Sequence, residues 1–500
     1  MNTSHTEPQA SSHTEAISTS HTRIIAPPQH AACDASHNAS SHPSADESQT
    51  PSAQDTHPRC LFVTLGCAKN QVDTDRMRAL LLASGFEEAQ DAMHCDCVII
   101  NTRSFLQAAT RESIDVTLTL AQKKKKNIKQ RPIIMCGCVP SRYGEGLNKE
   151  LPEVSAFVKA NDEDSIVAVV SKVLGLAHPN ASFTEELSAR ALRTVEGTSA
   201  FVKISEGCDR MCAFCAIPFI RGHYHSRGAL DILSEITMLM KGGVKEIVLI
   251  GQDTGIWGQD LDDPQTYTLS WLLAQVAQTI RPYHAWCRVL YLQPEGMTEE
   301  LIHTIRDTPE ILNYIDIPIQ HCSETILKRM GRKGSAPELH KLFAHLRAEI
   351  PNMVLRTTGM VGFPGESEDE AQELIDFFRE EAFDYMSVFS YSQEDGTTAS
   401  RMRDQVSAQT KLQRTQALRD CAEELGFAAT ASHVGEVVDV IVDSFDKESN
   451  ELIGHAWFQA PDCDGCVHLK KDSCKVGDVV RVRLTDAYCY ELEGEVLDAS

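Results

Sequence analysis

The sequence predicts an α/β protein with three modules: a doubly wound parallel α/β domain, a partial (β/α)6 barrel of the TIM type, and a small OB-like β-barrel at the C-terminus. Three observations predict this fold. Short apolar runs alternate with helical segments from Cys60 onward. The middle of the chain repeats the strand-then-helix pattern about six times. After about residue 431 the helical periodicity stops, and short strands with Gly and Asp turns follow.

The composition indicates a large globular protein from a reducing compartment. The chain has 500 residues, a formal net charge of −24 and 17 cysteines. Thiols scattered over a long chain are typical of the cytosol and not of a secreted disulfide scaffold. No apolar run approaches the roughly 20 residues that span a bilayer, and the N-terminus lacks the apolar core of a signal peptide. We therefore expect a cytoplasmic location and no membrane partner.

Residues 1–58 are expected to form a disordered tail. Ser, Thr, His, Ala and Pro dominate there, and few side chains could build a core. The tail holds seven of the 19 histidines, but their irregular spacing favours a solvated linker over a metal-binding tract. After it we place an N-terminal α/β domain at 59–185, the barrel at 186–430 and the small β-barrel at 431–500.

The N-terminal domain is predicted to gather polar loops at one edge of its sheet. Its first helix spans 72–83. Its strands span 61–65, 98–100 and 132–135. The first strand leads into Cys67 and the third into Cys138. Because the carboxyl ends of parallel strands share one edge, these two cysteines are expected to face one another. The lysine run at 123–126 is interpreted as a solvated helix end.

The barrel and the C-terminal domain are each defined by a series of short strands. The six barrel strands are predicted at 201–204, 246–250, 288–292, 314–317, 353–356 and 386–389. Barrels of this type place their reactive groups at the carboxyl ends of the strands. The strands of the C-terminal domain are predicted at 437–442, 451–458, 479–484 and 493–497.

The loop after the first barrel strand carries Cys208, Cys212 and Cys215 within the stretch KISEGCDRMCAFCAIP. Three thiolates on a tight loop are the ligand type of an iron–sulfur cluster. A structural zinc site takes four protein ligands, so zinc is the less favoured interpretation, as are buried structural thiols. On a four-iron cluster, three thiolates leave one iron open to a small-molecule chelate.

This spacing resembles the radical S-adenosylmethionine superfamily. Three stretches look like its methylthiotransferases, which replace a C–H bond by C–SCH3; they are TLGCAKNQVDTD (64–75), GCVPSRY (137–143) and KISEGCDRMCAFCAIPFIRGHYHSR (203–227). The resemblance implies an N-terminal α/β domain, a radical barrel and a C-terminal TRAM domain, an order that matches 59–500. It also implies a 4Fe-4S cluster on Cys208, Cys212 and Cys215, with S-adenosyl-L-methionine on the open iron.

Within that family, one branch modifies tRNA adenosine and another modifies the β-carbon of an aspartate in ribosomal protein uS12. The stretches that resemble the second branch are GQDTGIWG (251–258), RVLYLQPEGMTEELI (288–302), YIDIPIQHCSETILKRMGR (314–332), VGFPGESEDE (361–370), QAPDCDGCV (459–467) and LTDAYCYELEGEV (484–496). Residues 431–500 hold fifteen acidic and six basic residues, a net charge of −9. Such a surface suits a basic ribosomal protein better than tRNA phosphates.

We therefore expect a monomeric enzyme that methylthiolates uS12 in the small subunit and binds no tRNA stably. The resemblance implies an electron donor such as flavodoxin or ferredoxin. The alternatives are a tRNA adenosine methylthiotransferase and a non-catalytic iron–sulfur protein that binds ribosomes.

The resemblance also implies a second 4Fe-4S cluster on three cysteines of the N-terminal domain. Cys67 and Cys138 match two of them, but the third belongs in an Asn-Thr-Cys motif where this chain has Arg103. Cys97 lies six residues upstream of that position, about 20 Å away at ~3.3 Å per strand residue. Cys136 is a candidate third ligand, with a buried strand thiol as the alternative. A further hypothesis is that Arg103, as a cation, stabilises a persulfide or a cluster sulfide.

Several other residues are candidates for the cofactor site. Gln252 and Asp253 follow the second barrel strand, and Gly362 and Glu366 follow the fifth, so both loops are expected to open onto the cofactor. A turn shaped by glycine and proline is the alternative for the second loop. Arg221 and Arg227 are candidates to meet the cofactor carboxylate or an acidic substrate, with structural ion pairs as the alternative.

The remaining cysteines are interpreted as structural. The C-terminal domain contains four, which invite a zinc proposal; they are Cys463, Cys466, Cys474 and Cys489. Their loop follows the pattern of the resembling family, which needs no metal, so we expect none there.

Overall fold

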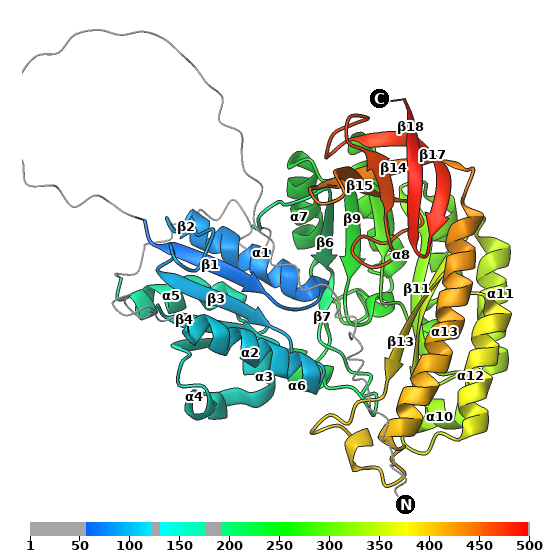
Figure 1. The fold of residues 1–500 in the computed structure, drawn as a ribbon, viewed down its shortest axis with the longest axis horizontal. Helices are drawn as coiled ribbons and strands as arrows, with labels where there is room; N and C mark the ends of the chain where they lie inside the picture. The colour runs from blue at the N-terminus through cyan, green and yellow to red at the C-terminus, as the bar shows by residue number, and fades with distance from the viewer. Residues whose placement is uncertain (1–56, 123–130, 177–191, 499–500) are drawn as a thin grey trace, which may run out of the picture. The chain divides into compact units, whose positions relative to one another are not determined.

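The computed structural model describes residues 57–122, 131–176 and 192–498, all within one compact unit (Figure 1). Three predictions fall partly or wholly outside the described residues: the tail at 1–58, the lysine run at 123–126 and the domain boundary at 185. No helix of the described residues is long and apolar enough to cross a bilayer.

The N-terminal domain is built on a five-stranded parallel sheet in the order β2-β1-β3-β4-β5. Its strands are β1 (Arg59–Thr64), β2 (Glu87–Glu88), β3 (Cys97–Thr102), β4 (Ile133–Gly137) and β5 (Ala156–Lys159). Helices cover both faces, as Figure 1 shows in blue and cyan. They are α1 (Ala68–Ala83) and α5 (Ile166–Leu174) on one face, and α2 (Gln107–Gln122), α3 (Cys138–Tyr143) and α4 (Leu147–Glu150) on the other. The doubly wound architecture is confirmed.

Alternation along β4 shows why this strand is a continuous apolar run. Ile133 and Met135 pack on the face covered by α2, α3 and α4, whereas Ile134 and Cys136 pack on the face covered by α1 and α5. Both faces are buried, so no position calls for a polar side chain. The strand ends at Gly137, and α3 starts at once with Cys138.

The middle of the chain forms a six-stranded parallel sheet in the order β13-β12-β11-β10-β9-β6, which confirms the partial barrel. Its strands are β6 (Ser199–Lys203), β9 (Glu246–Ile250), β10 (Trp286–Val289), β11 (Ile311–Gln320), β12 (Val354–Val361) and β13 (Tyr385–Ser390). The outer helices are α7 (Ala229–Lys241), α8 (Leu269–Ile280), α9 (Glu299–Asp307), α11 (Ala336–Glu349), α12 (Glu368–Glu381) and α13 (Ala408–Ser432).

Shorter strands and helices lie in the loops that follow the carboxyl ends of these strands. They are β7 (Ser205–Glu206), β8 (His225–Ser226), α6 (Ile217–Arg221) and α10 (Glu324–Arg329). The start of α12 is fixed by a capping box, in which Ser367 Oγ accepts from Glu370 N and the Glu370 carboxylate accepts from Ser367 N.

The C-terminal domain is a closed five-stranded barrel in the order β14-β15-β16-β18-β17. Its strands are β14 (Val437–Asp446), β15 (Glu451–Ala456), β16 (Val467–Lys470), β17 (Val479–Tyr488) and β18 (Glu491–Asp498). The sequence predicted four of them and missed β16. With only four residues, VHLK, this strand offers little periodicity to detect.

The C-terminal barrel packs against the inner face of the six-stranded sheet. Val248 and Ile250 of β9 share an apolar cluster with Val440 and Val482 of the small barrel, whereas their strand neighbours Ile247 and Leu249 pack outward against the helices. At the start of β9, a buried ionic group joins the two modules. Glu246 accepts from Arg288 Nε at 2.9 Å, and His455 Nε2 lies 2.8 Å from the same carboxylate.

This buried group predicts that stability falls on the alkaline side. Burial opposes charge on His455, but Glu246 and Asp443 raise its pKa from 6.5 to about 9. The folded state therefore holds a proton that the unfolded state releases above about pH 6.5. The stabilisation is complete below that pH and is lost as the pH rises through about 9, at a cost of roughly 3 kcal/mol by pH 10.

Denaturant midpoints measured between about pH 6 and pH 10 test this expectation. The fluorescence of Trp286, whose ring lies 6.1 Å from that of His455, reports on the same interface. His455→Gln should flatten the pH dependence. A wild-type midpoint that stays constant to pH 10, or an unchanged slope in the variant, would contradict the assignment.

Candidate functional site

Three cysteines lie on one loop at the carboxyl end of the first barrel strand. Cys208, Cys212 and Cys215 are free and half-buried. Backbone bonds hold the loop: Cys208 N donates to Gly222 O at 3.2 Å, and Cys215 N donates to Cys212 O at 3.0 Å. Burial, and then the other two thiols, raise the pKa of Cys215 to about 12. Because a metal ion is what turns such thiols into thiolates, this donor set fits a thiolate-bound cluster.

A glycine makes the loop possible. Gly207 has a φ of +74°, and a Cβ there would lie 2.0 Å from the backbone oxygen of His223. Only glycine meets both constraints. On its other side, the loop is fixed where Ala213 N donates to Met330 O at 2.8 Å.

Three buried polar atoms just beyond the carboxyl ends of β9 and β11 have no hydrogen-bond partner within the described residues. They are Gln252 Oε1, Asp253 Oδ1 and His321 Nε2. All three follow the carboxyl end of β9 or β11. An unpaired buried polar atom costs roughly 1–3 kcal/mol. Their placement at one end of the barrel therefore fits a polar ligand with donors and acceptors, as the amino, carboxylate and hydroxyl groups of S-adenosylmethionine provide.

Gln252 and Asp253, both predicted from the sequence, are tied to the cysteine loop. The Asp253 carboxylate forms an ion pair with Arg210, which lies between Cys208 and Cys212. Gln252 Nε2 donates to Glu206 at 2.9 Å. Each side chain keeps one oxygen free of these contacts. They thus hold the loop and still present an acceptor.

His321 was not singled out from the sequence. Its Nδ1 accepts from the backbone N–H groups of Cys322 and Ser323, both at 3.0 Å. Burial lowers its pKa to about 4. The ring is therefore neutral and carries its proton on Nε2, which is a donor available to a ligand.

The loop that contains Gly362 and Glu366 is held together from within. Gly362, with a φ of +75°, donates its N–H to both oxygens of the Glu366 carboxylate, at 2.9 and 2.8 Å. Arg414 Nη1 donates to the same carboxylate at 2.8 Å. The Glu366 side chain is thus committed to the turn, which was the alternative interpretation of this stretch.

Cys67 and Cys138 come together although 71 residues separate them in the sequence. Cys67 Sγ lies 3.4 Å from Asn70 Oδ1, and Cys138 Sγ lies 4.0 Å from the same amide. Asn70 is itself fixed, because its Nδ2 donates to Asn101 Oδ1 and Thr102 O, both at 3.0 Å. The sequence did not single out Asn70 as the residue between the two thiols.

Cys136 does not join this pair. Its side chain lies in the apolar cluster under α1 and α5, whereas Cys138 packs against Ala216 and Ile220. Arg103, at the position where the resembling family has cysteine, forms an ion pair with Glu112 of α2. Among the described residues, the structure thus gathers two thiols here and not three.

A buried ionic network lies between the two cysteine sites. Arg221 Nη1 donates to Asp73 at 2.9 Å, and Lys203 Nζ donates to Glu206 at 3.0 Å and also pairs with Asp73. Burial alone would raise the pKa of Glu206, but Lys203 and Arg221 lower it to about 2. Arg221 Nη2 stays buried without a hydrogen-bond partner.

This network belongs to both sites. Arg221 is the last residue of α6, the helix that begins after Cys215 and that packs against Cys138. Burial opposes the charge of Arg221, but Asp73 and Glu206, followed by Cys138 and Cys67, raise its pKa. Arg227, the other predicted arginine, instead donates to Lys203 O and Glu235, both at 2.7 Å. Its contacts are those of a structural ion pair.

Three family models match the chain, one for each module. Residues 59–159 match a family described as "Uncharacterized protein family UPF0004", residues 202–378 match the Radical SAM superfamily, and residues 434–497 match the TRAM domain.

Relatives match along most of the chain. The ribosomal protein uS12 methylthiotransferase RimO of Geobacter sulfurreducens is 39% identical over 443 residues, which cover 87% of this chain and 98% of that protein. RimO of Thermoanaerobacter sp. is 38% identical over 438 residues, with 87% and 98% covered. Among solved structures, the radical S-adenosylmethionine methyltransferase TsrM of Kitasatospora setae shares the fold at a TM-score of 0.50 and 12% identity, covering 67% of this chain and 72% of that one.

Proposed function

Since the chain belongs to the RimO family of ribosomal protein uS12 methylthiotransferases, we propose that it replaces a C–H bond on the β-carbon of a uS12 aspartate by C–SCH3. The observation that carries this proposal is the pairing of two thiol sites across α6. One is a loop with three cysteines at the mouth of the barrel, and the other is the Cys67 and Cys138 pair. A reaction that needs both a radical and a sulfur donor requires two such sites side by side.

In this proposal Cys208, Cys212 and Cys215 hold a 4Fe-4S cluster, and the ends of β9 and β11 bind S-adenosylmethionine. The bound cluster and cofactor supply a 5′-deoxyadenosyl radical that removes a hydrogen atom from the substrate. Gln252, Asp253 and His321 offer two acceptors and one donor for the polar groups of the cofactor. Arg210, through its ion pair with Asp253, keeps the cysteine loop against that binding surface.

Cys67 and Cys138 supply two of the protein ligands of the second cluster, the sulfur-delivering site. Asn70 holds the two thiols in place, and Arg103 stands where the third thiolate of the family belongs. Cys67 is the N-cap residue of α1, so the partial positive charge of the helix N-terminus points at this ligand. Arg221 adds a buried cation on the side of Cys138.

Iron content tests the second site. The reconstituted wild-type chain should hold roughly eight irons, four for each cluster. The double variant Cys67→Ala/Cys138→Ala should hold about half as much, still form 5′-deoxyadenosine, and no longer methylthiolate uS12. Cys136→Ala is the matched control, and it should keep both clusters because the Cys136 side chain lies in the apolar core. Equal iron in the wild type and the double variant would contradict the assignment.

The substrate side of the proposal rests on charge as well as on relatives. The net charge of −24, with −9 in residues 431–500, disfavours a tRNA substrate and favours a lysine- and arginine-rich protein. We propose flavodoxin or ferredoxin as the class of electron donor, a monomeric chain and a cytoplasmic site of action.

The deciding experiment incubates the reconstituted chain with uS12, S-adenosylmethionine and a reductant, and records the intact mass of uS12. A gain of one methylthio group in place of one hydrogen, localised to an aspartate by fragmentation, is expected. Digested tRNA from the same incubation should show no gain. A mass gain on tRNA and not on uS12 would overturn the substrate, and the absence of 5′-deoxyadenosine would overturn the enzyme.

A further inference from the structure

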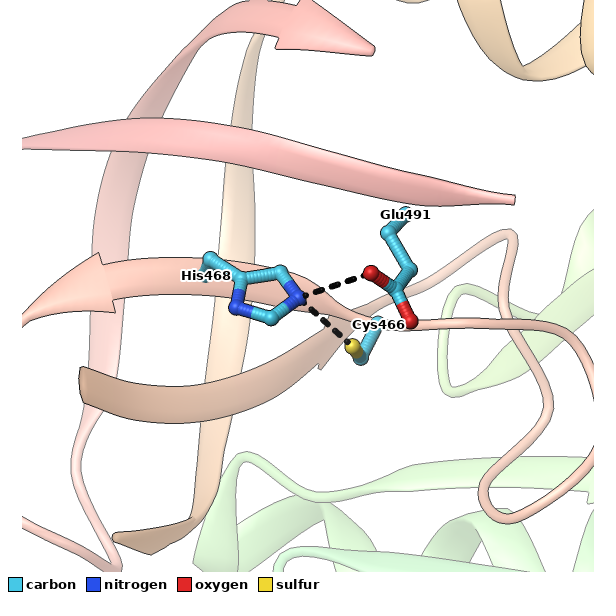
Figure 2. A group of neighbouring side chains, drawn as sticks. All are labelled: Cys466, His468 and Glu491. Carbon is cyan, nitrogen blue, oxygen red and sulfur yellow. Dashed lines mark hydrogen bonds and ion pairs between the residues drawn. The ribbon is translucent and has the colours of Figure 1, made fainter. Parts of the chain in front are cut away.

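The C-terminal barrel carries a group of metal-ligating side chains that the proposed reaction does not use. Cys466, which directly precedes β16, points toward His468 of β16 and Glu491 of β18, as Figure 2 shows. Cys466 Sγ lies 3.4 Å from His468 Nε2, which lies 3.3 Å from a carboxylate oxygen of Glu491. All three ligand atoms lie within 4.8 Å of one another.

The S–N and N–O separations match two edges of a tetrahedral zinc site. Zinc bonds of about 2.3 Å to sulfur, 2.05 Å to nitrogen and 2.1 Å to oxygen put S and N about 3.6 Å apart and N and O about 3.4 Å apart. A charge-assisted hydrogen bond between an imidazolium and a carboxylate would be shorter, about 2.7–2.9 Å. The N–O spacing of 3.3 Å is therefore closer to that of two ligands on a shared ion than to a direct charge-assisted hydrogen bond, whereas the S–N spacing of 3.4 Å fits either arrangement.

The backbone places the three side chains together in advance. Cys466 and His468 are two residues apart along an extended segment and so face the same way. Parallel pairing of β16 with β18 sets Val467 opposite Leu492, which brings Glu491 to the same face. The Cys466 carbonyl also accepts from Leu492 N at 2.9 Å. The backbone that carries the three ligands is therefore already ordered before a metal ion binds.

A fourth side chain orients the imidazole. His468 Nδ1 lies 2.9 Å from a carboxylate oxygen of Glu451. Since a carboxylate only accepts, Nδ1 donates to Glu451, and Nε2 is the ring nitrogen that faces Cys466 and Glu491. Metal-binding histidines commonly have such a carboxylate partner.

We propose that Cys466, His468 and Glu491 bind one divalent cation of the zinc class, with the fourth position open to water. The ion would link β16 to β18. Pairing of these two strands is part of the closed barrel, and its register comprises only Val467 with Leu492 and His468 with Glu493. The ion takes no part in the proposed reaction, since none of its ligands is a site residue of that reaction, and its open fourth position distinguishes it from a closed structural zinc site with four protein ligands.

This proposal differs from the four-cysteine zinc site that the sequence invites. Cys463 is exposed and is not in the group. The proposed ligands are one cysteine, one histidine and one glutamate instead of four thiols. The family pattern of the loop did not indicate this ligand set.

Zinc binding is tested on the full chain after its iron–sulfur sites have been reconstituted, so that the cluster cysteines are already ligated. Addition of Zn²⁺ and desalting should leave one zinc per chain. Zinc-edge X-ray absorption should show one sulfur neighbour at about 2.3 Å and nitrogen or oxygen neighbours at about 2.0–2.2 Å. Zinc should also raise the thermal midpoint of the wild type.

Variants complete the test. Cys466→Ser and His468→Gln should lose the zinc and its thermal effect, while Glu451→Gln, which keeps every ligand, should weaken zinc affinity roughly 10- to 100-fold. Cys489→Ser, in the same domain but outside the group, should bind like the wild type. Iron content must match in all of them.

The proposal is overturned if the wild type retains no zinc, if its absorption spectrum shows no sulfur or several sulfurs, or if His468→Gln and Cys466→Ser retain zinc equally well. Because the absorption spectrum is measured on the wild type, a variant that fails to fold does not hide the answer.

Discussion

Replacing Cys212 by serine should abolish formation of 5′-deoxyadenosine and remove about half of the iron from the reconstituted chain, the share of one of two four-iron clusters. Cys212 sits in the middle of the loop between Cys208 and Cys215. Serine keeps the size of the side chain but is a poor ligand for iron, so the loop should fold and the cluster should not assemble. Methylthiolation of uS12 should then fall to the level without enzyme.

The measurement pairs iron analysis with detection of 5′-deoxyadenosine after chemical reduction. Cys489→Ser is the matched control, an exposed cysteine of the C-terminal domain, and should keep both iron and turnover. Sustained 5′-deoxyadenosine formation by Cys212→Ser would show that these three cysteines do not hold the radical cluster.

The elements whose bounds the sequence predicted best are strands that are buried on both faces. A strand such as β9, with both faces buried, is a continuous apolar run, and the predicted range 246–250 coincides with the observed Glu246–Ile250. The missed elements are short. β5 and β16 have four residues each, too few for a periodic pattern, and they exist because neighbouring strands offer hydrogen-bond partners.

The candidate site was predictable where one short stretch holds all the proposed ligands. Cys208, Cys212 and Cys215 are fixed by spacing alone, and the convergence of Cys67 with Cys138 followed from parallel sheet topology. The role of Asn70 was not predictable in this way. Its contacts with both thiols depend on where α1 lies against β3 and α3, which no local pattern encodes.

The buried network was the least predictable part of the site. Asp73 and Lys203 are 130 residues apart, and each alone looks like an ordinary surface charge. Only the packing of α1 against the barrel shows that Lys203 forms ion pairs with Asp73, Glu206 and Glu163 at the same time. The group joins the module that carries Cys67 to the module that carries Cys215, so its charge balance should govern both stability and sulfur transfer.

Lys203→Met tests this balance. The methionine fills a similar volume but leaves the carboxylates of Asp73, Glu163 and Glu206 with Arg221 as their main buried cation. Removing one partner of a buried ion pair typically costs about 3–5 kcal/mol, because the remaining charge is desolvated and unpaired. We expect a loss of that size in the free energy of unfolding, measured by denaturant titration. Methylthiolation should be lost more completely than 5′-deoxyadenosine formation, since the cysteine loop itself is untouched.

A double-mutant cycle separates the ionic effect from lost packing. Asp73→Asn in the Lys203→Met background removes one of the stranded charges, so the double variant should be less destabilised than the sum of the two single variants. Lys241→Met, at an exposed lysine on α7, should change stability by no more than about 0.5 kcal/mol. Strict additivity, or a loss below about 1 kcal/mol for Lys203→Met, would mean that the two modules are held together by apolar packing and that the charges between the cysteine sites serve another purpose.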